Sequence, residues 1–108
     1  MTFDYRLKKE KDFNLVFKNG KKLFSKNLTF VFFPSKEVKA GFAVSKKHGT
    51  SVKRNRIKRL LRESFRSFLP NIRQNFFFVF IPKVSENYSL EDFKESMDYL
   101  FKKGGFYK

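Results

Sequence analysis

The feature that most constrains the fold is an unbroken apolar run in the second half of the chain, Phe76 to Ile81, with the sequence FFFVFI. Pro82 ends the run, because a proline cannot donate a hydrogen bond to a neighbouring strand. A run this short, rich in aromatic and β-branched residues, favours a strand over a helix, and its lack of polar positions predicts a buried central strand. The 108 residues leave room for one domain, residues 1–108, built around it.

Further strands are predicted in the first half of the chain. Leu28 to Phe33, LTFVFF, is a strand candidate that Pro34 stops, and Lys39 to Lys46 is another. A weaker signal covers Lys21 to Ser25. The side chains of the 39–46 strand are expected to divide into a large face and a small, shallow face: Phe42 and Val44 against Gly41, Ala43 and Ser45.

The N-terminal segment is predicted to be an extended arm followed by a helix. Alternating Phe3, Tyr5 and Leu7 favour an extended arm over residues 1–8. Residues 9–18 then have helical spacing, with apolar side chains on one face. Gly20 is expected to end this helix in the left-handed conformation.

Two longer helices follow. Val52 to Leu69 is helical in pattern, with Thr50 or Ser51 as its N-cap and Pro70 ending it. The last helix begins after Ser89, in a capping-box-like sequence, and ends at the glycine pair 104–105. Its apolar residues share one face: Phe93, Met97, Leu100 and Phe101. The pattern as a whole predicts an α+β fold.

Composition narrows the function. The chain has 25 Lys and Arg against 10 Asp and Glu, so its net charge is +15, which is typical of a protein with a polyanionic partner. It has no cysteine, which excludes thiolate catalysis and Cys-ligated zinc. Its one histidine is His48. The acids form no evident cluster, so we expect no catalytic residue and no metal ligand in the protein. No apolar run reaches bilayer length and no signal peptide is visible, which predicts a cytoplasmic protein without a membrane partner.

The charge is concentrated between residues 46 and 66, which contain nine Lys or Arg and one acid, Glu63. On a helical projection, the apolar residues of 52–69 occupy one arc, and Asn55, Arg59, Arg62 and Arg66 occupy another. Arginine grips two phosphate oxygens at once and also stacks on bases. A basic stripe nearly free of acids therefore predicts contact with folded RNA, and His48 is interpreted as a surface or RNA-contact residue.

These residues resemble a known family. The stretch Ala43-Val44-Ser45-Lys46-Lys47-His48-Gly49, followed by Val52-Lys53-Arg54-Asn55-Arg56-Ile57-Lys58-Arg59-Leu60-Leu61-Arg62-Glu63, is similar to the bacterial ribonuclease P protein subunit. Arg54-Asn55-Arg56 matches that family's signature motif. The N-terminal Arg6-Leu7 and the pattern Asp12-Phe13, Val16-Phe17, Gly20 are also similar, so the resemblance covers nearly the whole chain.

The resemblance implies an α/β sandwich like domain 2 of ribosomal protein S5, with a four-stranded sheet and a left-handed βαβ crossover around the Arg-Asn-Arg helix. It implies an endoribonuclease whose catalytic RNA subunit removes the 5′ leader from precursor tRNA. Both RNAs are then partners, no small molecule is a substrate, and Mg²⁺ of the holoenzyme is held mainly by RNA rather than by protein side chains.

The resemblance also implies which residues of this chain contact RNA. The implied contacts to the RNA subunit come from the basic helix and the preceding segment: Lys46, Lys47, Lys53, Arg54, Asn55, Arg56, Lys58, Arg59, Arg62 and Arg66. The implied leader contacts are Phe13, Phe17, Val31, Phe33 and Lys26. Val31 stands where the family often has an aromatic residue, so Phe33 on the same strand face either substitutes for it or that stacking contact is missing. Plain core packing is the alternative for Phe13 and Phe17.

Other functions fit less well. Composition alone also suits a ribosomal or other structural RNA-binding protein, and the Arg-Asn-Arg block argues against it. A protein nuclease needs clustered carboxylates or paired histidines, which the sequence lacks. Binding to a membrane surface needs the apolar face of the basic helix, and that face is expected to cover the sheet.

Overall fold

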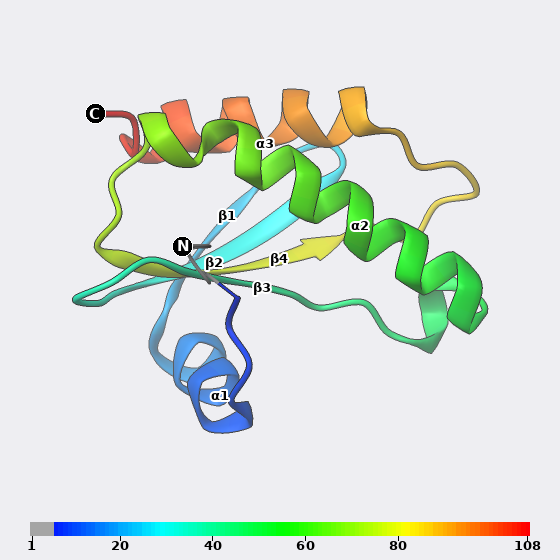
Figure 1. Ribbon diagram of the computed structural model, residues 1–108, viewed down its shortest axis with the longest axis horizontal. Helices are drawn as coiled ribbons and strands as arrows, with labels where there is room; N and C mark the ends of the chain where they lie inside the picture. Colours follow the sequence, from blue (N-terminus) through cyan, green and yellow to red (C-terminus); the bar gives the residue numbers. More distant parts are fainter. Residues whose placement is uncertain (1–5) are drawn as a thin grey trace, which may run out of the picture.

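A computed structural model describes residues 6–108 and contains three helices packed on a four-stranded mixed sheet (Figure 1). The α+β prediction is therefore confirmed. The elements, in chain order, are α1 (Glu10–Asn19), β1 (Lys21–Phe24), β2 (Leu28–Pro34), β3 (Lys39–Phe42), the 3-10 turn η1 (Lys46–His48), α2 (Ser51–Phe68), the 3-10 turn η2 (Leu69–Asn71), β4 (Phe76–Pro82) and α3 (Leu90–Gly104).

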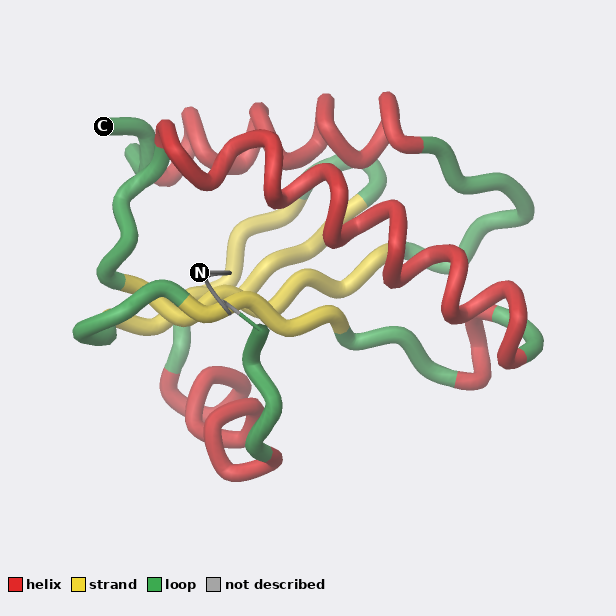
Figure 2. The backbone as a smooth tube through the Cα atoms, in the orientation of Figure 1, coloured by secondary structure: helices red, strands yellow, loops and turns green. Residues whose placement is uncertain are grey.

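The sheet has the strand order β1-β2-β4-β3, which places the FFFVFI run in the interior of the sheet, as predicted. β2 pairs with β1 and β4 in antiparallel orientation, whereas β3 and β4 are parallel. α2 connects the parallel pair by crossing one face of the sheet, and the positions of β3, α2 and β4 make this crossover left-handed (Figures 1 and 2). This is the handedness that the resemblance implied and that few βαβ units have.

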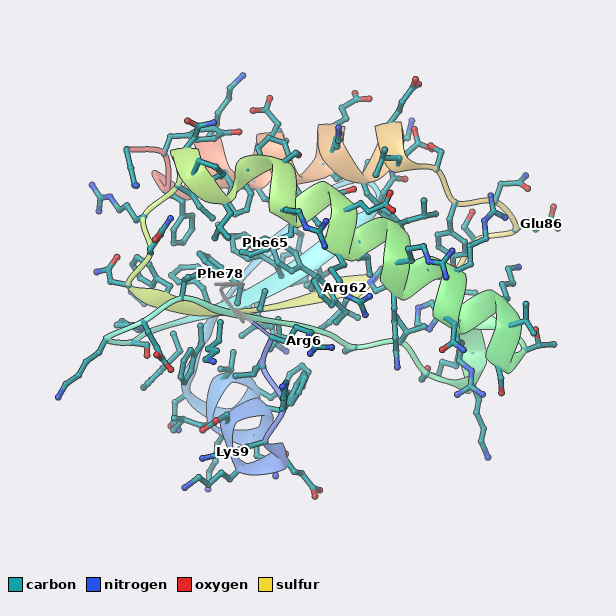
Figure 3. All side chains as sticks on the ribbon, viewed as in Figure 1. Arg6, Lys9, Arg62, Phe65, Phe78 and Glu86 are labelled. Carbon is teal, nitrogen blue, oxygen red and sulfur yellow. The ribbon has the colours of Figure 1, made fainter. Side chains whose placement is uncertain are left out.

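The two faces of the sheet are covered unequally. α2 and α3 lie side by side over one face, and the short α1 lies against the other (Figure 2). The larger core lies under α2 and α3, where Phe65 of α2 packs against Phe78 of β4 with ring centroids 6.0 Å apart (Figure 3). The smaller core under α1 contains four buried residues: Leu7, Val16, Val31 and Val79. α1 packs against β2 and β4, and as a helix it spans a shorter distance than these extended strands, so part of this second face remains open.

The predicted helix boundaries agree with the structure. The Thr50 hydroxyl accepts a hydrogen bond from the Lys53 backbone N–H, and the Ser89 hydroxyl accepts one from that of Asp92. These caps satisfy backbone donors that have no partner within the first turn of a helix. Gly105 ends α3 in the left-handed conformation, with a φ of 70°.

Two local predictions were wrong. β3 ends at Phe42 rather than Lys46, and Lys46 and Lys47 lie in the turn η1 instead of on a strand end. Gly20 has an extended backbone, with φ −78° and ψ 165°. It is needed for close packing, because a Cβ there would lie 2.4 Å from the Val16 carbonyl oxygen and 2.7 Å from a methyl group of Val31.

The predicted N-terminal arm is partly visible. Arg6 forms a parallel bridge with Ala40 of β3, and the Leu7 backbone N–H donates to the Ala40 carbonyl at 2.9 Å. Phe3 and Tyr5 lie outside the described residues. Within the described part of the chain, no helix is both long and apolar enough to cross a bilayer.

Candidate RNA-binding surfaces

The basic surface of α2 follows from its amphipathic sequence. Its apolar side buries Ile57, Leu61 and Phe65 against the sheet and α3. The opposite side exposes the predicted polar residues Asn55, Arg56, Arg59 and Arg66, while Lys53, Arg54, Lys58 and Arg62 are partly buried. The predicted stripe is therefore a continuous basic face of the helix, suited to phosphate groups.

Two arginines on this helix each have one guanidinium nitrogen without a hydrogen-bond partner among the described residues. These are the Nε atoms of Arg54 and Arg62, and both are buried. The Arg54 side chain is oriented by a bond from one terminal nitrogen to the Ser51 hydroxyl, 3.1 Å long. A buried donor without a partner carries a free-energy cost, and these two Nε atoms are not accessible from solvent in this conformation.

The turn η1 lies before α2 and is fixed by His48. This histidine is predicted to be a surface or RNA-contact residue, but its side chain is buried, with 6 % exposed. Its Nδ1 accepts from the Ser45 backbone N–H at 3.0 Å, and its Nε2 lies 2.8 Å from the Pro82 carbonyl oxygen. His48 thereby ties η1 to the end of β4, while Lys46 and Lys47 remain exposed.

An open groove of about 570 Å³ lies on the part of the sheet that α1 leaves uncovered. We call it the sheet groove. Its floor is formed by Thr29, Ala43 and Ile81, and Phe17 of α1 stands at its side. The other lining residues come from the segments that follow β3 and β4: Val44, Ser45, Lys47, His48, Pro82, Lys83 and Val84. A groove with an apolar floor, an aromatic side chain and two lysines is suited to a single-stranded nucleic acid.

Phe13 and Phe17 occupy different positions relative to this groove. Phe17 is 38 % exposed and lines it. Phe13 is partly buried, with its ring over Gly41, where an added Cβ would lie 2.5 Å from two ring carbons. The two rings are stacked with their centroids 6.5 Å apart. Phe13 therefore packs between Phe17 and the sheet. Its ring covers the predicted shallow face only at Gly41, whereas Ala43 and Ser45 of that face line the groove.

The remaining predicted leader contacts are dispersed. Val31 and Phe33 share the sheet face under α1, as predicted, but Val31 is fully buried and presents no surface to a ligand. Phe33 packs against the small core from its edge, outside the sheet groove. Lys26 lies in the β1–β2 turn beside α3, also outside the groove.

The sequence predicted the shallow face that contributes Ala43 to the groove floor, but not Thr29, Ile81 or one exposed aromatic residue. Thr29 pairs with Ile81 across the sheet, and Phe24 pairs with Thr29 on the other side, so their side chains form one row on the open face. Phe24 is 58 % exposed. The strand register could have found this row, but only once the order of the strands was known.

Among residues 6–108, no three His, Asp or Glu side chains gather closely enough to hold a metal ion. The available chemistry is that of phosphate binding, base stacking and hydrogen bonding.

The fold and these two surfaces define a small RNA-binding protein with a basic helix and an adjoining sheet groove. Residues 1–105 match the family model described as Ribonuclease P. The chain therefore belongs to the ribonuclease P protein family.

Relatives match this chain over most of their length. The ribonuclease P protein component of Clostridium kluyveri is 44 % identical over 110 residues, covering 96 % of this chain and 97 % of that protein. That of Caldanaerobacter subterraneus subsp. tengcongensis is 40 % identical over 107 residues, with coverage of 95 % and 91 %. The structure of the Staphylococcus aureus RNase P protein matches with a TM-score of 0.84 at 26 % identity, over 98 % of this chain and all of that one. The Thermotoga maritima protein matches with 0.81 at 30 % identity, over 91 % and 96 %.

Proposed function

We propose that this chain is the protein subunit of a ribonuclease P holoenzyme, in which it binds the catalytic RNA through α2 and η1 and the 5′ leader of precursor tRNA through the sheet groove. The observation that supports this most is the position of η1. Lys47 and His48 line the groove, and α2 begins three residues after His48. One rigid segment therefore joins the two surfaces, so that a protein docked on the catalytic RNA holds the leader beside it.

The basic face of α2 acts by charge. It neutralises crowded phosphates of the RNA subunit, so that catalytic RNA and precursor approach each other at a lower concentration of Mg²⁺. Arg54 and Arg62 contribute two of the guanidinium groups of this face, and the Arg54 group is oriented by its bond to Ser51. Bond cleavage and Mg²⁺ binding belong to the RNA in this proposal, and the protein contributes no catalytic residue. The proposed place of action is the cytoplasm.

The sheet groove acts by selective binding. Mature tRNA has no leader, so stacking of a leader base on Phe17 and contacts to Lys47 and Lys83 stabilise only the precursor complex. The substrate is then bound more tightly than the product, and release follows cleavage.

The test is single-turnover cleavage of a precursor tRNA by a bacterial catalytic RNA subunit at low Mg²⁺, with and without this protein. The expected result is that the protein restores cleavage at the mature 5′ end and that the protein alone cleaves nothing. Tight RNA binding without restored cleavage would contradict the proposal and favour a ribosomal or structural RNA-binding protein.

A further inference from the structure

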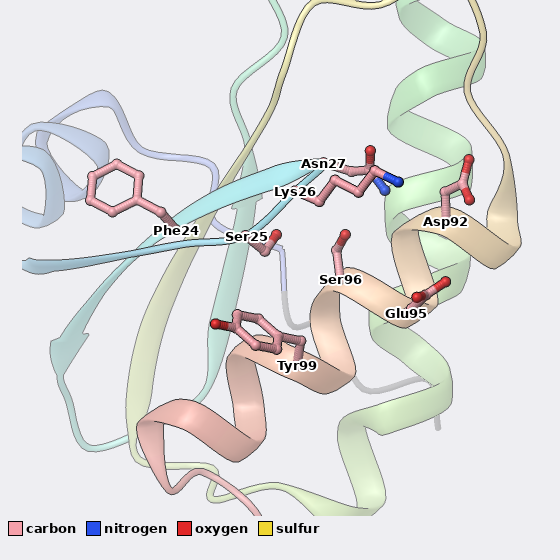
Figure 4. A pocket seen from close by; sticks show the side chains of 8 residues that line it. All are labelled: Phe24, Ser25, Lys26, Asn27, Asp92, Glu95, Ser96 and Tyr99. Atoms are coloured by element: carbon pink, nitrogen blue, oxygen red, sulfur yellow. The ribbon is translucent and has the colours of Figure 1, made fainter.

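A second hollow lies between the β1–β2 turn and α3, on the other side of the sheet edge from the sheet groove (Figure 4). It has a volume of about 420 Å³. We call it the α3 hollow. Its polar lining comes from two elements, with Lys26 and Asn27 on the turn and Asp92, Glu95, Ser96 and Tyr99 on α3.

The Ser25 hydroxyl, which also lines the α3 hollow, is bonded to the Leu28 backbone, whereas three polar groups on α3 have no such partner in the part of the chain that the structure describes. Ser96 is only 4 % exposed, yet its hydroxyl, which points into the hollow in Figure 4, has no hydrogen-bond partner among the described residues. Asp92 and Glu95 are exposed on the same helix face and form no ion pair within residues 6–108. Asp92 lies in the first turn of α3, where the helix dipole stabilises a carboxylate, and Glu95 lies beyond that turn. Together with Ser96 they supply acceptors along the α3 side of the hollow.

The α3 hollow is connected to the sheet groove by shared residues. A smaller hollow between them is lined by Lys83, which also lines the groove, and by Asn27 and Asp92, which also line the α3 hollow. The Lys83 backbone N–H donates to the Asn27 carbonyl at 3.0 Å, which holds the two loops together. A strand of RNA leaving the groove at Lys83 therefore reaches the α3 hollow by crossing one edge of the molecule.

We propose that the α3 hollow binds a nucleotide of the precursor leader further from the cleavage site than those in the sheet groove, and that it prefers guanine. This inference rests on the proposed function. The Watson–Crick edge of guanine offers two adjacent N–H donors, which match a carboxylate acceptor, whereas uracil offers one. Tyr99 provides a ring for the base, and Lys26 and Lys83 receive the flanking phosphates at the rim. A cationic occupant fits less well, because Lys26 is part of the lining.

The test uses the holoenzyme assembled from this protein and a bacterial catalytic RNA subunit. Equilibrium dissociation constants are measured for precursors whose leaders increase in length, with guanine or uracil in the distal part. We expect affinity to rise again once the leader extends beyond the groove, and to rise more with guanine. Glu95→Gln should remove this gain by about fivefold or more, the low end for one bidentate base contact.

Glu91→Gln is the matched control, because Glu91 is an exposed glutamate on α3 that does not line the hollow. Both substitutions remove one negative charge, so any general gain in RNA affinity is the same for both. Only Glu95→Gln should weaken binding of the long guanine leader. Ser96→Ala should weaken it in the same direction, and a thermal unfolding curve shows whether that variant is folded.

The outcomes separate the two proposals. Equal effects of Glu95→Gln and Glu91→Gln on every leader would overturn the assignment of the α3 hollow. The assignment would also be overturned if a precursor with a short leader bound more tightly than mature tRNA but a longer leader gave no further gain in affinity. If even the short leader adds no affinity, the sheet groove itself is misassigned and the proposed function fails.

Discussion

The Nε2 atom of His48 lies 2.8 Å from the carbonyl oxygen of Pro82, 34 residues further along the chain. Because Nδ1 accepts a hydrogen bond from the Ser45 backbone N–H, the proton of the neutral ring is on Nε2, which donates to Pro82. The bond joins the turn before α2 to the end of the central strand. It sets the position of Lys47 at the wall of the sheet groove.

His48→Ala should therefore affect both stability and leader binding. It removes a buried ring and leaves the Pro82 carbonyl without this donor, so we expect a loss of about 1–3 kcal/mol in the free energy of unfolding. Urea denaturation measures it, with Lys36→Ala in the exposed β2–β3 turn as the control. Precursor affinity should fall more than mature tRNA affinity. An unchanged preference for precursor would show that η1 holds its position without His48.

Phe17→Ala tests the stacking surface. Loss of one base stack is worth about 1–3 kcal/mol, so precursor affinity should fall at least about fivefold and mature tRNA affinity should stay constant. Leu15→Ala is a close control, since Leu15 lies on the same helix and has the same exposed fraction, 38 %. A similar loss in both variants would mean that α1 contributes only through its own stability.

Much of the fold could be predicted because its signals are local. The caps at Thr50 and Ser89 and the apolar run of β4 depend on neighbouring residues, and the structure confirms them. Gly20 could not be predicted correctly, because its requirement comes from the approach of β2, a tertiary contact. The handedness of the crossover likewise has no local signal, and it came from the resemblance alone.

The candidate site likewise has a part that local sequence signals predict and a part that depends on tertiary packing. Helical periodicity places the basic residues of α2 on one face whatever surrounds the helix. The groove, in contrast, depends on which part of the sheet α1 covers. Val31 and Phe17 belong to neighbouring elements with similar apolar character, yet one is fully buried and the other lines the groove. Only the packing of α1 separates them.

Arg59→Ala tests the electrostatic account of α2. Arg59 is exposed, so the variant should unfold like the parent protein while binding the RNA subunit more weakly. With about five phosphate contacts to RNA, a fourfold rise in salt should weaken binding of the parent about 100-fold. The variant should lower the slope of log affinity against log salt by about one contact. A flat salt response in the parent would contradict phosphate neutralisation.

Two glycines offer a matched pair for stability. At Gly20 an added Cβ meets the Val16 backbone at 2.4 Å, so Gly20→Ala requires α1 to move and should cost about 1–3 kcal/mol. At Gly105 nothing lies within 4 Å of the added Cβ, and the strain of a φ of 70° should cost about 1 kcal/mol. Denaturant unfolding of both variants compares close packing with backbone strain. Equal costs would mean that α1 shifts easily.

The C-terminal segment is held by Tyr107, whose hydroxyl donates a hydrogen bond to Asp98 of α3. This bond lowers the pKa of Asp98, and so, to a smaller extent, does the ammonium of Lys102, 3.1 Å from the same carboxylate. Burial and the nearby Asp98 carboxylate raise the pKa of Tyr107. A lowered carboxylate pKa stabilises the fold above the pKa of the unfolded chain, and the contribution is lost as pH falls through the folded value. Since Asp98 is substantially exposed, Tyr107→Phe should cost only about 1 kcal/mol at pH 7.

The difference between Tyr107→Phe and the parent should therefore shrink as the pH falls below about 3.9, the ordinary pKa of an aspartate. Urea unfolding across the acid range measures it. Asp98→Asn provides the control, because its side chain does not titrate and the pH-dependent part should disappear in that background. A difference between Tyr107→Phe and the parent that stayed constant down to low pH would show that the Tyr107 hydroxyl stabilises the fold independently of the charge on Asp98, since both variants keep the ring that packs against Phe101.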